Sequence, residues 1–228
     1  MVGSRVTRLV FSSTAAVYGE PRETPIPESH PLDPTSTYGR SKVAVEMLLA
    51  SFAEAYGLRS VRLRYFNAAG AAEGGAIGED HSPETHLIPV TLACALGLRD
   101  SVTVHGLDYP TRDGSCIRDY VHIEDLAAAH VLALEALGTQ RDCMIYNLGN
   151  GRGYTVRQVA DIAREVTGVD FPVIETGRRP GDADMLVASS ERINDELGWE
   201  PRFPDLREII ASAWAWHSAR PNGYCDKH

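Results

Sequence analysis

Short apolar segments alternate with longer amphipathic ones along this chain, and this alternation restricts its fold more than any other feature. Residues 8–13, 60–65 and 144–148 are short runs rich in Val, Leu, Ile and aromatic side chains, which predicts buried strands. Residues 38–56 and 125–137 carry apolar side chains at helical spacing. Strands that alternate with helices are typical of an α/β domain with a parallel sheet. We therefore expect an α/β fold.

The segments between these elements carry local signals of their own. Five prolines lie between residues 21 and 34, and because proline fixes φ and lacks an N–H donor, we expect this segment to be extended and irregular. A hydroxyl side chain among residues 35–37 can cap the helix 38–56, and Gly57 can end it. The Gly- and Ala-rich segment 67–83 is expected to be a loop. Further helices are expected over residues 87–98, 155–167, 190–197 and 206–218, and further strands over 102–104, 120–123 and 172–175.

A tyrosine and a lysine lie one turn apart at the start of the helix 38–56. Residues four apart on a helix share a face, so Lys42 should project beside Tyr38. A free phenol has a pKa of about 10 and is a poor base near neutral pH, but a nearby ammonium stabilises the phenolate. Thr14, at the end of the strand 8–13, would hydrogen-bond the same substrate hydroxyl. The three residues predict a proton-transfer site beside a nicotinamide, although an ordinary helix pair with a solvated lysine also fits the spacing alone.

Further motifs follow in a fixed order. They occupy residues 11–19, 63–70, 78–80, 86–89, 106–111, 113–114, 116–122, 146–149 and 177–182. This series resembles the extended short-chain dehydrogenases that act on sugar nucleotides, the epimerase/dehydratase family, and within it the UDP-glucose (UDP-galactose) 4-epimerases. The resemblance runs from the first ten residues to Trp214 and Trp216. Sugar dehydratases of the same superfamily usually carry an acidic pair where this chain has Ala15 and Ala16, which argues against dehydration.

The resemblance implies a partial Rossmann-type parallel sheet that is interleaved with a smaller α/β substrate domain. Residues 1–69 and 117–149 would form the dinucleotide-binding part, and residues 70–116 and 150–228 the sugar-nucleotide domain. No Gly-rich dinucleotide fingerprint precedes the strand 8–13. We therefore expect the 228 residues alone neither to retain NAD nor to epimerise, and the strand 8–13 to present an apolar edge prone to association.

The implied activity is the interconversion of UDP-glucose and UDP-galactose with bound NAD. Tyr38 would remove the C4 hydroxyl proton while NAD takes the C4 hydride, and the hydride would return to the other face of the 4-keto sugar. Lys42 would hold the nicotinamide ribose, and Thr14 would align the substrate hydroxyl. Two alternatives stand beside this reading: an inactive remnant that binds a UDP-sugar or a partner, and an epimerase for another UDP-sugar.

The resemblance also implies two sets of binding residues. The cofactor set consists of Ser12, Tyr38, Lys42, Tyr65 and Phe66. The substrate set consists of Asn67, Leu87, His105, Arg118, Arg179, Asp182 and Leu186. Asn67 and the two arginines would meet the diphosphate, which suits the forked guanidinium. Asp182 would accept from the uridine ribose, and Leu186 would line the hexose pocket, where a bulky aromatic residue excludes N-acetyl sugars.

Plainer structural roles compete with several of these assignments. Tyr65 and Phe66 could be core aromatics at a strand end. Arg118 could form a local ion pair with Asp119, and the Arg178–Arg179 segment could be a solvated turn. His105 stands where the family often has an aromatic residue on uracil, and a His ring can still stack there. His122, at a strand end, is expected to be structural.

Charge and cysteine usage exclude several classes of function. The net charge of −9 argues against a nucleic-acid or anionic-membrane partner, and the apolar run 9–11 is too short to span a membrane. The cysteines Cys94, Cys116, Cys143 and Cys225 are widely scattered, and no Cys-x-x-Cys or Cys/His ligand spacing occurs. We therefore expect no metal site, no disulfide framework and the reduced thiols of a cytoplasmic protein. The family further implies a homodimer in the full-length form.

Overall fold

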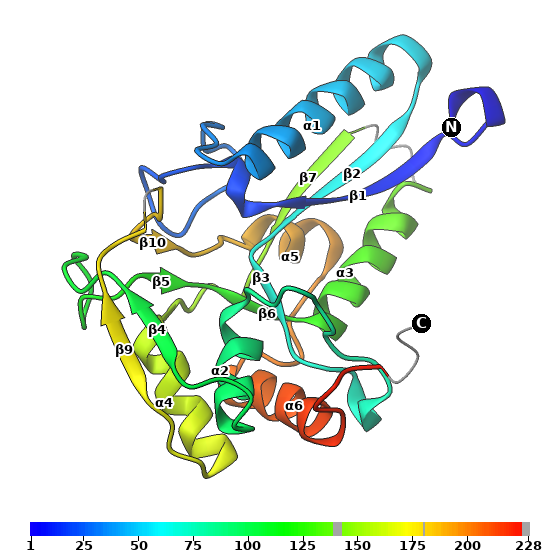
Figure 1. Cartoon of the computed structure of the whole chain (residues 1–228). Coiled ribbons are helices and arrows are strands. Elements are labelled where there is room, and N and C mark those ends of the chain that lie inside the picture. The colour runs from blue at the N-terminus through cyan, green and yellow to red at the C-terminus, as the bar shows by residue number, and fades with distance from the viewer. Residues whose placement is uncertain (139–142, 180, 225–228) are drawn as a thin grey trace.

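A three-stranded parallel sheet forms one half of the structure, a computed structural model that describes residues 1–138, 143–179 and 181–224 (Figure 1). Its order is β1-β2-β7, with β1 at Arg8–Thr14, β2 at Arg59–Tyr65 and β7 at Cys143–Leu148. Within the described ranges, β1 pairs with β2 alone and so lies at an edge of the sheet. The parallel sheet and its helices confirm the α/β prediction.

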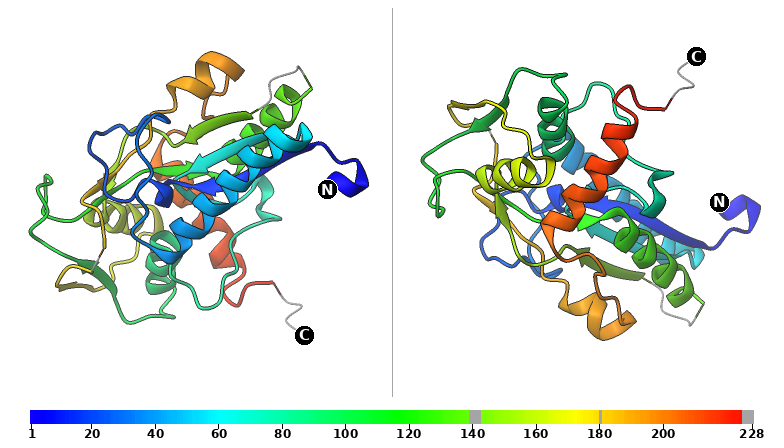
Figure 2. Two further views of the ribbon diagram at one scale, coloured as in Figure 1. Left: turned by 90° about the horizontal axis from the view of Figure 1, so that it is seen from above. Right: turned by 90° about the horizontal axis from the view of Figure 1, so that it is seen from below.

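Helices cover both faces of this sheet (Figure 2). Helix α1 (Thr37–Tyr56) begins where the Ser36 hydroxyl accepts from the amide of Gly39, and it ends at Gly57 with φ of 64°. Helix α3 (Ile123–Ala136) lies on the opposite face from α1 and packs its alanines against Val61 and Leu63 of β2. Burial of this apolar surface, which removes it from water, is the main force that holds the layers together.

A second core lies below the sheet in Figure 1, where three helices pack together. They are α2 (Leu87–Ala95), α4 (Val156–Thr167) and α6 (Leu206–Ala219). The strands around this core pair as β4 (Val102–His105) with β9 (Val173–Thr176), β3 (Asn67–Ala69) with β6 (Tyr120–His122), and β10 (Met185–Leu186) with β5 (Ile117–Arg118) and β8 (Tyr154–Thr155). The remaining elements are α5 (Glu191–Leu197) and three short 3₁₀ turns, η1 (Val2–Ser4), η2 (Ala15–Val17) and η3 (Glu73–Gly75).

Three sequence predictions need correction. The expected strand 120–123 ends at His122, because the Nδ1 atom of that residue accepts from the amide of Glu124 and caps α3. The helix expected over 87–98 ends at Ala95, two residues before Gly97 takes φ of 71°. The expected loop 67–83 contains β3, which pairs with β6.

The structure also bears on the expected thiols and membrane segments. Cys94, Cys116 and Cys143 are free thiols, whereas Cys225 and Pro180 lie outside the described residues. In the part of the chain that the structure describes, no helix combines the length and the apolar character needed to cross a bilayer.

Candidate active site

The site begins at the carboxyl end of β1, where open α/β sheets place their ligands. Thr14 is the last residue of this strand and is largely buried. Its backbone is extended, and its Oγ1 atom accepts from the amide of Ala16 at 3.2 Å, which starts the turn η2. The threonine hydroxyl is therefore held at the strand end by a local cap.

Helix α1 approaches this strand end very closely. A Cβ atom at Gly39 would lie 2.4 Å from the backbone oxygen of Ala16, so only glycine allows this approach. Tyr38, one residue earlier, is 53% exposed. The close approach brings the first turn of α1 beside the end of β1.

Lys42 connects the helix to the strand. Its Nζ atom donates to the backbone oxygen of Ser12 at 2.9 Å and lies 5.5 Å from the centre of the Tyr38 ring. The same ammonium lies 5.0 Å from the ring centre of Phe11. The predicted neighbours Tyr38 and Lys42 therefore share one face of α1. The Lys42 ammonium lies beside the Tyr38 ring near the end of β1.

The two aromatic residues after β2 have different surroundings. Burial raises the pKa of Tyr65, a hydrogen bond with the Ser12 side chain acts against this rise, and the nearby Tyr38 adds to it. Ser12 also pairs through Oγ with Nε2 of His130 at 2.9 Å. Phe66, in contrast, is buried in a cluster with Val17, Tyr18 and Ile26. Tyr65 thus lies next to the Tyr38 group, whereas Phe66 is a core side chain.

A second group of predicted residues gathers on the β5–β10 pair. Arg118 on β5 forms an ion pair with Asp182, in which Nη2 lies 3.3 Å from Oδ1. Its Nη1 atom donates to the backbone oxygen of Ala183 at 2.9 Å. Leu186 on β10 is the register partner of Arg118. Strand pairing therefore brings residues from distant parts of the sequence together.

His105 and Arg179 belong to the same group. Burial lowers the pKa of His105, and the positive charge of Arg179 lowers it further, while Asp182 acts in the opposite direction. The His105 ring pairs through Nδ1 with the hydroxyl of Thr176 at 2.8 Å. These two predicted residues therefore lie around Asp182.

Asn67 and Leu87 complete the predicted substrate set. The Asn67 side chain donates from Nδ2 to the backbone oxygen of Asp119 at 2.7 Å, directly after Arg118. Leu87 is the first residue of α2 and packs against a cluster that includes Val104 and Tyr109.

Three of the plainer readings can now be judged. Asp119 pairs with backbone rather than with Arg118: its carboxylate accepts from the amides of Asn150, Gly151 and Ala188. Arg178 forms an ion pair with Asp108 and stacks on Tyr109 at 4.0 Å, so this turn is not simply solvated. His122 is buried and caps α3, which confirms its structural role.

The two groups of residues share one hydrophobic cluster. Phe66, beside Tyr65, and Leu186, beside Arg118, both pack into the cluster that contains Tyr18, and Ile26 bridges to Ala188 within it. The predicted catalytic and substrate residues therefore lie on neighbouring parts of the same structure.

The sequence analysis missed a buried ion pair beneath the site. Arg64 on β2 donates from Nη2 to Oε2 of Glu46 on α1 at 2.5 Å, and both side chains are almost fully buried. Ser13, next to Thr14, donates to Oε1 of Glu46 at 2.6 Å. The one available signal was that Glu46 follows Lys42 by four residues and so shares its inward face.

Comparison with known proteins agrees with these features. The family model described as GDP-mannose 4,6 dehydratase matches residues 2–212. The UDP-glucose 4-epimerase of Halalkalibacterium halodurans is 52% identical over 224 residues, which cover 98% of this chain and 67% of that protein. That of Streptococcus mutans is 50% identical over 222 residues, with 97% and 67% covered. The chain thus spans about two thirds of the length of these relatives.

Solved structures give the same result. A crystal structure of UDP-glucose 4-epimerase superposes with a TM-score of 0.94 at 49% identity and covers 97% of this chain and 68% of its own. The UDP-glucose 4-epimerase from Brucella ovis in complex with NAD has a TM-score of 0.90 at 44% identity, with 94% and 66% covered. That from Bifidobacterium longum in complex with NAD+ and UDP has a TM-score of 0.90 at 36% identity, with 97% and 67% covered.

Proposed function

Because this chain belongs to the UDP-glucose 4-epimerases, within the NAD-dependent epimerase/dehydratase family, we propose that Tyr38 is its acid/base and that Lys42 and Thr14 assist it. UDP-glucose 4-epimerases interconvert UDP-glucose and UDP-galactose with NAD. The observation that carries the proposal is the position of the Lys42 ammonium, 2.9 Å from the Ser12 oxygen and 5.5 Å from the Tyr38 ring.

Each residue of this group has a distinct task. The Tyr38 phenolate takes the proton from the sugar hydroxyl at C4 and later returns it, and the Lys42 ammonium stabilises that phenolate. Thr14 hydrogen-bonds the same hydroxyl and fixes its direction. The cap that Thr14 provides to Ala16 holds its side chain in place, so orientation does not depend on the substrate.

The nicotinamide end of NAD fits the residues around Lys42. An ammonium carries three donors, and the Ser12 oxygen takes one of them, which leaves others for the ribose hydroxyls. Ser12 on β1 and Tyr65 at the end of the neighbouring strand β2 would flank the nicotinamide. NAD, when bound, supplies the hydride chemistry, and the protein supplies orientation and charge.

The group on β5 and β10 would hold the UDP-sugar. Asp182 pairs with Arg118 and so holds its guanidinium in one orientation, in which it meets the diphosphate together with Asn67 and Arg179. Asp182 would also accept from the uridine ribose, His105 would stack on the uracil, and Leu87 would contact the nucleotide. Leu186, as the register partner of Arg118, would line the hexose pocket.

Epimerisation rather than dehydration is favoured by the residues after Thr14. Ala15 and Ala16 form the turn η2 at the place where dehydratases carry an acidic pair. Neither side chain can donate or accept a proton. The dehydratase name of the family model therefore describes the superfamily and not the chemistry that we propose for this chain.

We also propose that the full-length form is a cytoplasmic homodimer with the two interleaved domains given above. The apolar side chains of Met47, Leu48 and Phe52 are exposed on α1, which supports a contact between two copies along this helix. The free thiols of Cys94, Cys116 and Cys143 suit a reducing compartment. The distinct cores around β2 and around α2, α4 and α6 support two domains, and each core also takes in side chains of the other domain: Ile193 and Trp199 in the first core, Ala69 and Tyr120 in the second.

The proposal is tested by assaying UDP-galactose conversion. The chain is fused to the part of the Halalkalibacterium halodurans relative that it does not match, and we call this protein the fusion. We expect the fusion to form UDP-glucose and no 4-keto-6-deoxy sugar. Release of a 4-keto-6-deoxy product, or no conversion by a folded fusion that contains NAD, would contradict the proposed function.

A further inference from the structure

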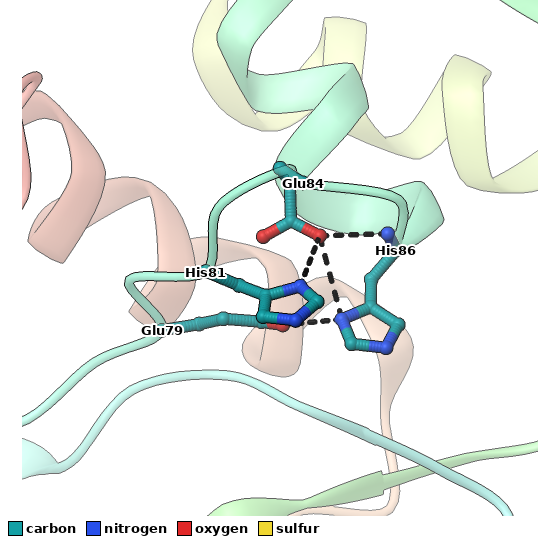
Figure 3. A group of neighbouring side chains, drawn as sticks. All are labelled: Glu79, His81, Glu84 and His86. Atoms are coloured by element: carbon teal, nitrogen blue, oxygen red, sulfur yellow. Dashed lines mark hydrogen bonds and ion pairs between the residues drawn. The ribbon is translucent and has the colours of Figure 1, made fainter.

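The loop before α2 brings together four side chains that nothing in the proposed reaction uses. They follow the pattern Glu79-x-His81-x-x-Glu84-x-His86, and one ligand atom from each lies within 4.8 Å of all the others. Figure 3 shows both imidazole rings turned toward the carboxylate of Glu84, with the carboxylate of Glu79 beside them. The His81 and His86 rings stack with their centres 5.3 Å apart.

Two of the distances between these atoms are close to those of a tetrahedral metal site. Nitrogen and oxygen ligands lie about 2.0–2.2 Å from a tetrahedral Zn²⁺, so neighbouring ligand atoms are about 3.4 Å apart. The Nδ1 atom of His86 lies 3.4 Å from Oε1 of Glu84, and that of His81 lies 3.7 Å from the same oxygen. His86 and Glu79 are 2.5 Å apart as a hydrogen-bonded pair and would separate by about 1 Å around a metal.

The donor set selects the class of metal. Two imidazoles with two carboxylates suit zinc and its neighbours in the first transition series, whereas Mg²⁺ and Ca²⁺ prefer oxygen ligands alone. We propose that Glu79, His81, Glu84 and His86 bind a divalent transition metal of the zinc type. All four ligands come from the protein, which is typical of a structural site rather than a catalytic one.

Backbone contacts already hold the loop in the shape that this site needs. Oε1 of Glu84 accepts from the amides of Thr85 and His86, each at 2.7 Å, so its carboxylate is fixed above the start of α2. At the other end of the loop, the amide of Gly78 donates to the Tyr224 hydroxyl at 3.0 Å. The metal would close the loop between these two anchors, directly before Leu87.

This proposal departs from the expectation of no metal site, which stays untested. That expectation rested on Cys/His spacing, and carboxylate ligands fall outside such a search. Asp80, between two of the proposed ligands in sequence, accepts from the amide of Tyr224 at 3.0 Å and so connects the loop to the segment after α6.

The test is metal binding by the chain without a polyhistidine tag and after EDTA treatment. Titration with ZnCl₂ in a calorimeter should show about one site per chain, as expected for one four-ligand group. Replacement of Zn²⁺ by CoCl₂ should give the intense visible absorption of a tetrahedral site. MgCl₂ and CaCl₂ should bind far more weakly than ZnCl₂, and tighter binding of either would overturn the assignment.

Two variants and a matched control make the test specific. Glu84→Gln keeps an oxygen for the two amide hydrogen bonds but removes the anionic ligand, and the double variant His81→Ala/His86→Ala removes both imidazoles. Each should weaken Zn²⁺ binding by about 100-fold or more, because loss of supporting outer-shell groups alone costs 10- to 100-fold. Glu20→Gln/Glu23→Gln removes two exposed carboxylates from another loop and should bind Zn²⁺ as the wild type does. Equal affinity and equal Co²⁺ spectra in all four proteins would refute the site.

Discussion

The Lys42 ammonium donates to the backbone oxygen of Ser12 at 2.9 Å and so ties the first turns of α1 to the end of β1. This bond crosses from a helix to a strand, so the lysine cannot turn freely into solvent. Because the Tyr38 ring lies 5.5 Å away, the position of the positive charge beside the phenol is set by the fold before any ligand binds. Preorganised charge of this kind needs no rearrangement during proton transfer.

Replacing the proposed base should remove turnover but not binding. In the fusion, Tyr38→Phe should lower kcat by ~100- to 10,000-fold, the usual contribution of a general acid/base group. UDP affinity should stay near that of the parent fusion, because Arg118 and Asp182 pair with each other and not with Tyr38. Steady-state kinetics and UDP titration check this. Tyr56→Phe, at the far end of the same helix, is the matched control, and near-normal turnover of Tyr38→Phe would exclude the assignment.

The size of residue 186 should set the choice of sugar. Leu186 is smaller than the aromatic residue that excludes N-acetyl sugars in this family, so the fusion should prefer UDP-glucose and UDP-galactose and retain some activity on UDP-N-acetylglucosamine. Leu186→Tyr should lower the ratio of kcat/KM for the N-acetyl sugar to that for UDP-glucose by about 10-fold or more, since pocket shape discriminates by 10- to 200-fold. An unchanged ratio would mean that Leu186 does not line the hexose pocket.

Breaking the buried ion pair should destabilise the protein strongly. Glu46→Gln leaves the Arg64 guanidinium buried without its counter-charge, and loss of one partner of a buried pair typically costs about 3–5 kcal/mol. Urea unfolding of the 228-residue chain measures this. Glu54→Gln makes the same change at an exposed position of α1 and should alter the free energy of unfolding by less than about 0.5 kcal/mol. Similar losses in both variants would show that the pair contributes nothing specific.

The same ion pair should make the stability of the protein depend on pH. Burial opposes the charged form of Glu46, but the hydrogen bonds and charge of Arg64 outweigh it, and the pKa of this carboxyl lies below its ordinary value of 4.5. A group whose pKa is lower in the folded state stabilises above its unfolded pKa, and this stability is lost as the pH falls through the folded value. Urea midpoints of the wild type should therefore fall below about pH 4.5 more steeply than those of Glu46→Gln. Parallel pH profiles would contradict this.

Cofactor retention should depend on the phosphate-binding turn. Dinucleotide pyrophosphate rests on the turn after the first strand of a Rossmann fold and on the next helix N-terminus. The 228 residues contain the group that we propose faces the nicotinamide, but they contain no such Gly-rich turn before β1. We expect these residues alone to bind UDP, but to release no NAD on denaturation and to show no turnover. The fusion should retain NAD and turn over substrate. Stoichiometric NAD with robust turnover in the 228-residue chain would refute this prediction.

Local signals explain why much of the fold was predictable. Helix α1 was expected over 38–56 and spans Thr37–Tyr56. Its bounds were predictable because the residues that end it, Ser36 and Gly57, directly flank it in sequence. The short strands β5, β8 and β10 were missed, because each contains only two residues and forms through a partner far away in sequence.

The candidate site divides in the same way. The Tyr38 and Lys42 pair follows from helical spacing, whereas the Glu46–Arg64 pair depends on how α1 docks on β2. Pattern alone does not report such docking. The Glu79 to His86 group likewise becomes a cluster only when the loop folds back on itself.

The contact at Gly39 limits how closely α1 can approach the end of β1. A methyl group there would meet the Ala16 oxygen at 2.4 Å and the Pro34 side chain at 2.9 Å. The helix therefore packs so closely against the strand end that no side chain fits between them. The approach of the first turn of α1, which carries Tyr38, to the end of β1 is thus limited by the Ala16 backbone and the Pro34 side chain. Any side chain at position 39 would therefore push the first turn of α1, and Tyr38 with it, away from the strand end.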